Sequence, residues 1–204
     1  MKCIVAVSAL VGLAAAHGYY QTPAPRKPGD AYSAACGEQA FNMMNSDING
    51  NVQGLESLVA NQADYDASKC NLWMCKGMKY DDNTANVHSF SAGEEIPMYF
   101  QIVAPHTGYA NVSVVDTATN SILAANLTSW DVYASTSVPM KAEWQNFTVT
   151  MPDTLSGKCA TAGECVIQMH WNAPPPVDQT YQSCIDFTLA GSNSSKRSHA
   201  RDFS

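Results

Sequence analysis

Hydrophobic and polar residues alternate in short runs along the second half of the chain. The runs occupy residues 96–102, 111–114, 147–151, 167–171 and 185–189. Side chains that alternate with a period of two belong to β-strands with one buried face. Glycine, proline, asparagine and aspartate separate the runs, as is typical of turns between antiparallel strands. The pattern predicts an antiparallel β-sandwich of the immunoglobulin-like or fibronectin-like kind.

The first half of the chain shows little regular periodicity. Three prolines before residue 30 indicate an irregular segment, and residues 45–54 are rich in the Asn, Asp, Ser and Gly typical of loops. Residues 55–60 and 65–73 are predicted to hold short helical turns. We therefore expect an all-β domain with long loops and short helices.

Residues 1–16 have the pattern of a secretory signal peptide. Lys2 gives a positive start, and residues 4–13 are mostly apolar but too short to span a bilayer. Three alanines then supply the small residues of a cleavage site. Cleavage is predicted between Ala16 and His17, which would leave His17 as the first residue of the mature protein.

The remaining chain is predicted to form one domain over residues 17–190, followed by a polar, disordered tail over residues 191–204. The formal net charge of −7 argues against binding of nucleic acid, which favours a basic face. No polybasic patch favours an anionic lipid surface, and no further apolar stretch is long enough to span a membrane. We expect a secreted, extracellular monomer that binds neither nucleic acid nor membrane.

Six cysteines remain once Cys3 is removed with the signal peptide. An even number in a secreted chain predicts three disulfides, for which fifteen connectivities exist. Short spacing favours two local pairs and leaves a third, so the predicted disulfides are Cys70–Cys75, Cys159–Cys165 and Cys36–Cys184. No CxxC pair is present, which disfavours a cysteine metal site.

Four Asn-x-Ser/Thr sequons are candidate N-glycosylation sites on a secretory route. They begin at Asn111, Asn126, Asn146 and Asn193.

A histidine at the mature N-terminus would carry an α-amino nitrogen and an imidazole nitrogen, which together can chelate a metal. The best second ligand is His106, because the sequence Ala-Pro-His-Thr-Gly places it in a tight loop directly after a predicted strand. His88 and His199 are interpreted as surface and tail residues, and His170 alone would be an ordinary core histidine. Three nitrogen donors suit copper(II) better than calcium or magnesium, which prefer oxygen.

Gln179 and Tyr181 lie two residues apart and would share one face of a strand. Either side chain could line the metal site. Taken singly, Tyr181 is equally consistent with a core tyrosine and Gln179 with a polar surface residue.

These motifs together resemble the fungal lytic polysaccharide monooxygenases. The shared features are a signal peptide that ends before His-Gly, a loop histidine in Ala-Pro-His-Thr-Gly and a late Gln-x-Tyr. Longer stretches are similar to auxiliary activity family 16 and cover nearly the whole mature chain. They are residues 17–31, 34–37, 64–68, 70–73, 130–136, 179–181 and 184–187.

The resemblance implies a copper-binding histidine brace. His17 would bind copper through its amino group and one ring nitrogen, and His106 would supply the third nitrogen. Tyr181 would take the distant axial position. Gln179, His170 and Tyr181 would be the catalytic residues, and Gln179 and His170 would hydrogen-bond the oxygen cosubstrate.

The implied activity is oxidative cleavage of cellulose or a related insoluble polysaccharide, with C1 attack, an external electron donor, and O₂ or H₂O₂. Tyr19, Tyr20 and Tyr109 would form a flat substrate surface or pack in the core. Two alternatives stay open: a histidine-brace copper-binding protein without cleavage activity, and a noncatalytic polysaccharide-binding sandwich. The Gln-x-Tyr motif favours the enzyme. No positioned carboxylate pair indicates glycoside hydrolysis.

Overall fold

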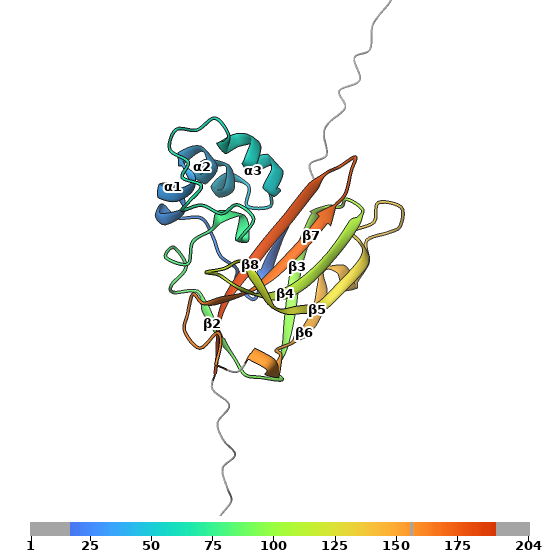
Figure 1. Cartoon of the computed structure of the whole chain (residues 1–204). Coiled ribbons are helices and arrows are strands. Elements are labelled where there is room, and N and C mark those ends of the chain that lie inside the picture. Colours follow the sequence, from blue (N-terminus) through green and yellow to red (C-terminus); the bar gives the residue numbers. More distant parts are fainter. Residues whose placement is uncertain (1–16, 156, 191–204) are drawn as a thin grey trace, which may run out of the picture.

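The computed structural model describes residues 17–155 and 157–190. The predicted signal peptide, the predicted tail, His199 and the sequon at Asn193 lie outside these residues. Two β-sheets form the body of the domain (Figure 1). The three-stranded sheet has the order β1-β3-β6, with β1 at His17–Thr22, β3 at Glu95–Ala104 and β6 at Asn146–Thr150. The five-stranded sheet has the order β2-β8-β7-β4-β5, with β2 at Val87–Phe90, β4 at Gly108–Asp116, β5 at Ser121–Tyr133, β7 at Cys165–Ala173 and β8 at Gln179–Leu189.

The main hydrophobic core lies between the two sheets. It contains residues of both, among them Phe100 from β3, Val112 from β4 and Ile167 from β7. The five alternating runs of the sequence fall in β3, β4, β6, β7 and β8, so the predicted β-sandwich is confirmed. The alternation did not reveal β1, β2 and β5. One pair also departs from the antiparallel prediction, because β2 runs parallel to β8.

Three short helices pack on the outer side of the five-stranded sheet, beside β8 (Figure 1). They are α1 at Asp30–Cys36, α2 at Glu38–Ser46 and α3 at Val52–Val59. A second core joins their apolar side chains to Val115, Val166 and Cys184 of the sheet. The first half of the sequence shows little regular periodicity, so α1 and α2 were not predicted. None of the helices in the described part of the chain is long and apolar enough to span a membrane.

The helical predictions are partly wrong. The expected turn at 55–60 belongs to α3, which begins inside the segment interpreted as a loop. The Asn51 side chain caps α3 by accepting a hydrogen bond from the Gly54 amide at 2.7 Å. Residues 65–73 form turns without a helix, and the nearest helical segment is a short 3₁₀ turn, η1, at Cys75–Gly77.

Two of the three predicted disulfides are wrong. Cys159–Cys165 is confirmed, but the other pairs are Cys36–Cys70 and Cys75–Cys184. Folding brings α1 against the loop after α3, so Cys36 meets Cys70 with their Cα atoms 5.2 Å apart. Gly77 packs directly beside both of these sulfurs, where a Cβ atom would lie 2.7 Å from Cys70 Sγ. Closeness in sequence was therefore a poor guide to the pairing.

Candidate metal centre

Strand pairing brings His17 and His106 to the same end of the sandwich. His17 begins β1 and is the register partner of Ala104, the last residue of β3. His106 follows Ala104 by two residues, in the loop that joins β3 to β4. The two predicted metal-binding histidines are therefore neighbours across the end of one strand pair.

Two glycines allow the backbone beside each histidine to pack closely. A Cβ atom on Gly18 would lie 2.5 Å from the Phe100 ring and 3.2 Å from the Trp171 ring. A Cβ atom on Gly108 would collide with the backbone carbonyl of Asn172. Glycine at these positions lets β1 pack closely on the Phe100 and Trp171 rings and lets the chain after His106 pack against the backbone at Asn172.

Gln179 and Tyr181 lie at the same end of the domain. In the β7–β8 pair, Trp171 is the register partner of Tyr181, so the Tyr181 ring lies beside the indole that packs under Gly18. The Tyr181 hydroxyl donates a hydrogen bond to Gln179 Oε1. Burial raises the pKa of Tyr181, so the phenol is neutral at neutral pH. The structure thus brings Gln179 and Tyr181 to the end of the sandwich that carries the histidines.

His170 is not part of this group, which corrects the expectation for a catalytic role beside Gln179. Successive side chains of a strand point to opposite faces, and Trp171 faces the inner core. His170 is turned the other way, and its Nδ1 lies 3.5 Å from Gln182 Nε2. Gln182 in turn donates to the Trp73 carbonyl at 3.0 Å, and burial lowers the pKa of His170. His170 is a half-buried residue of the opposite face.

The three candidate surface tyrosines separate into two kinds. Tyr109, at the start of β4, is 47% exposed. Tyr19 and Tyr20 are 3% and 0% exposed, so the expectation that they form a substrate surface is wrong. Tyr20 packs edge-on against Phe100, with ring centroids 5.3 Å apart, and Tyr19 belongs to the core beneath the helices.

The donor atoms at this end of the domain fit copper. No three His, Cys, Asp or Glu side chains within residues 17–155 and 157–190 gather closely enough to hold a metal ion. A site built on His17 and His106 therefore needs a further donor, and the α-amino group of a cleaved chain would be one. His106 Nδ1 is buried without a hydrogen-bond partner among the described residues. Nitrogen donors of this kind suit copper(II).

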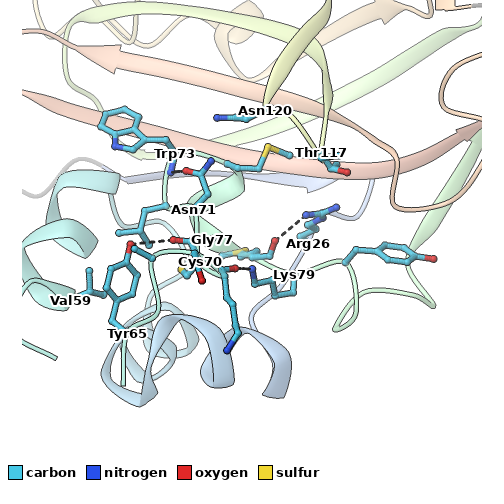
Figure 2. Close-up of a pocket in the computed structure, with 18 of the residues that line it drawn as sticks. Arg26, Val59, Tyr65, Cys70, Asn71, Trp73, Gly77, Lys79, Thr117 and Asn120 are labelled. Carbon is cyan, nitrogen blue, oxygen red and sulfur yellow. Dashed lines mark hydrogen bonds between the residues drawn. The ribbon is translucent and has the colours of Figure 1, made fainter. Parts of the chain in front are cut away.

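The polar groove of Figure 2 is a different feature. It has a volume of about 820 Å³ and is lined by residues that include Asn71, Trp73 and Asn120. His17, His106, Gln179 and Tyr181 are not among its lining residues. The candidate metal centre therefore lies outside this groove.

Sequence reasoning missed one residue of the site, Asp47. Its Oδ2 lies 3.2 Å from His17 Nε2. Asp47 follows the last residue of α2, within the segment interpreted only as loop. The turn composition of this segment indicates a loop but carries no sign of a partner for His17.

Comparisons with known proteins identify several similar solved structures and one matching family model. None of the curated proteins compared is significantly similar to the chain. Similar solved structures include a chitin-binding domain from Burkholderia pseudomallei, with 14% identity, coverage of 86% of this chain and 100% of that chain, and a TM-score of 0.42. A lytic polysaccharide monooxygenase from Streptomyces lividans shows 18% identity, coverage of 85% and 100%, and a TM-score of 0.43. A cellulose-active enzyme of this kind, solved with copper, shows 17% identity, coverage of 86% and 100%, and a TM-score of 0.43.

These structural similarities are weak, and the assignment rests on the family model. The model described as "Lytic polysaccharide mono-oxygenase, cellulose-degrading" matches residues 17–187, which is nearly the whole described chain. The match begins at His17 and includes His106, Gln179 and Tyr181. The chain belongs to the family of lytic polysaccharide mono-oxygenases, enzymes that use copper to oxidise polysaccharides.

Proposed function

We propose that this chain is a secreted enzyme that oxidises cellulose at C1, and that His17 and His106 hold its copper. The observation that carries the proposal is the pairing of His17 with the end of β3, two residues before His106. The family match, which begins at His17 itself and includes His106, supports the proposal. The auxiliary activity family 16 affiliation belongs to this proposal, supported by the sequence motifs that resemble it.

Each residue of the site has a proposed role. The amino group and ring of His17, with the ring of His106, would provide three nitrogen donors, and the Tyr181 phenol would lie beside the copper. Bound copper would supply one-electron redox chemistry that no side chain of the site offers. Gln179 Oε1 already accepts a hydrogen bond from the Tyr181 hydroxyl. The Gln179 amide nitrogen would therefore donate to an oxygen cosubstrate.

The proposed substrate contact is the surface around the His106 loop. Tyr109 exposes 47% of its surface next to this loop, and an exposed aromatic ring can pack on the apolar face of a sugar. Thr107 and Thr136 hydrogen-bond to each other beside it, at 3.2 Å between their hydroxyl oxygens. An exposed aromatic ring with neighbouring hydroxyl groups suits contact with a polysaccharide.

Signal-peptide cleavage, the source of electrons and glycosylation are also part of the proposal. Cleavage of the predicted signal peptide would free the His17 amino group and send the protein outside the cell. An external donor would provide electrons, and the enzyme would act as a monomer. Of the sequon residues, Asn126 and Asn146 are exposed and open to glycosylation, whereas Asn111 is half-buried.

The test uses protein that begins at His17 and is loaded with copper. Swollen cellulose, xylan, mixed-linkage glucan and chitin are incubated with ascorbate, and soluble products are measured by mass spectrometry. We expect cello-oligosaccharides with aldonic acid ends, the signature of C1 oxidation. Copper-stripped protein and the His106→Ala variant are the controls. Copper binding without products on any polymer would favour the noncleaving copper protein, and copper-independent polymer binding would favour the noncatalytic sandwich.

A further inference from the structure

We propose that Asp47 is a positioning residue that orients the His17 imidazole for copper. The proposal rests on the proposed function, because it takes His17 as a ligand. Asp47 Oδ2 lies 3.2 Å from His17 Nε2, at a partly exposed contact where the side chains are 45% and 24% accessible. The carboxylate would keep a proton on Nε2 and leave the lone pair of Nδ1 for the metal.

The choice of ring nitrogen follows from covalent geometry. A metal bound to both the amino nitrogen and Nδ1 of one histidine closes a six-membered ring through Cα, Cβ and Cγ. Nε2 lies on the far side of the imidazole and cannot reach the same ion together with the amino group. The nitrogen held by Asp47 is therefore the one that the chelate does not use. Carboxylates that hold the outer nitrogen of a metal-binding histidine fix its tautomer and raise its basicity.

Asp47 is itself held in place by its own loop. Its Oδ1 accepts hydrogen bonds from the Asn49 backbone amide at 3.1 Å and from Asn49 Nδ2 at 2.9 Å. The Asp47 amide donates to Met43 O at 2.9 Å, which ties the loop to the end of α2. With Oδ1 and the backbone engaged, Oδ2 is the oxygen that remains for His17.

A buried lysine braces this loop from beneath. Lys76 is fully buried, and its Nζ donates to the carbonyls of Ile48 and Gly50, the latter at 3.1 Å. The same Nζ lies 5.2 Å from the centre of the Tyr19 ring, two residues after His17. Lys76 thus contacts both the strand that begins at His17 and the loop that carries Asp47.

The brace is anchored to the five-stranded sheet. The Lys76 amide donates to Gln182 Oε1 at 3.3 Å, and the preceding residue forms the Cys75–Cys184 disulfide. Gln182 and Cys184 both belong to β8, the strand of Tyr181. A chain of contacts therefore runs from β8 through Lys76 and the loop to Asp47 and His17, so the orientation of the imidazole is coupled to the rigid part of the domain.

The test compares Asp47→Ala with a matched control, Asp153→Ala. Asp153 is exposed and follows β6, whose end pairs with the start of β3, far along that strand from His17. Both variants are prepared with His17 as the first residue, and circular dichroism checks that they fold. In the metal-free proteins at pH 8, ¹⁵N chemical shifts report which nitrogen of His17 carries the proton. Calorimetry then measures copper affinity.

We expect the proton on Nε2 in the wild type and a mixture of tautomers in Asp47→Ala. Copper affinity should fall about tenfold, the lower end for loss of an outer partner, because Asp47 is partly exposed. Asp153→Ala should match the wild type. An unchanged tautomer and affinity in Asp47→Ala would overturn the positioning role while leaving the ligands intact. Wild-type affinity in His106→Ala would instead refute the proposed function, so the two failures are distinguishable.

Discussion

The ring of Tyr181 packs on the indole of Trp171, with the two ring centroids 4.5 Å apart. The residues are register partners in the β7–β8 pair, and Trp171 is fully buried. Because the indole cannot move without disturbing the core, the Tyr181 ring has one orientation. Its hydroxyl is therefore fixed beside Gln179 rather than free to rotate toward solvent.

Removal of that hydroxyl is expected to change the copper environment without removing a strong ligand. Tyr181→Phe keeps the packing on Trp171, so we expect a shifted electron paramagnetic resonance spectrum and a change in copper affinity of less than about tenfold. Tyr65→Phe is the control, because the Tyr65 hydroxyl donates to Cys70 O on the helical side of the domain. An identical spectrum in Tyr181→Phe and the wild type would place Tyr181 outside the copper environment.

One extra alanine before His17 is expected to abolish tight copper binding. It converts the α-amino group into an amide, which no longer offers a free lone pair, and moves the new amine away from the imidazole. Isothermal titration calorimetry should show a loss of more than about 100-fold, beyond the range for outer-shell partners. Retention of full affinity would refute the chelate at His17.

His106→Ala is expected to weaken copper binding by more than about 100-fold while leaving the unfolding transition nearly unchanged. His106 lies in a loop and contributes little to the core, so its loss removes a ligand but few packing contacts. His88→Ala is the matched control, since His88 lies in β2 and contacts Ala24 O at 3.1 Å. Equal copper affinity in the two variants would contradict the assignment of His106.

Lys76 predicts a pH dependence of stability. Burial lowers its pKa from 10.5 to about 7 in the folded protein, although Asp47 partly opposes the shift. Between these two values the unfolded state binds more protons, so the free energy of unfolding should rise with pH from about 7 toward 10.5. The slope is at most about 1.4 kcal/mol per pH unit.

Denaturant unfolding at pH 7, 8 and 9, with disulfides intact, measures this slope. Lys76→Met should flatten it, because the side chain no longer titrates. Lys158→Met removes an exposed lysine and should keep the wild-type slope. A rise of equal size in the wild type and in Lys76→Met would assign the pH dependence to other groups.

The sequence predicted the strands that alternate regularly and missed the others for physical reasons. β5 pairs with β4 through several register shifts, and Asn126 within it has a positive φ of 52°. Each shift breaks the alternation on which the prediction depends. β2 has only four residues and is held by its pairing with β8, a contact that no local pattern reveals.

The sequence likewise indicated some residues of the candidate site and missed others. An N-terminal histidine, a Pro/Gly loop and a Gln-x-Tyr spacing singled out His17, His106, Gln179 and Tyr181 as candidates, and the fold brings them to one end of the sandwich. His170 looked equivalent in spacing, but strand alternation turns it to the opposite face. Asp47 and His17 lie 30 residues apart in the sequence. Their contact depends on the loop after α2 and on the buried Lys76 that holds this loop. Such contacts belong to tertiary structure and leave no periodic signal.

The Cys75–Cys184 cross-link also bears on the order in which the chain matures. It joins residues separated by 109 positions, whereas Cys36–Cys70 spans only 34. The shorter cross-link can close while the second half of the chain is still being synthesised, but the longer one must wait for β8. Since β8 also carries Tyr181, the strand that supplies Cys184 supplies the Tyr181 phenol as well. The long cross-link and the proposed metal site thus both depend on the same late-synthesised strand.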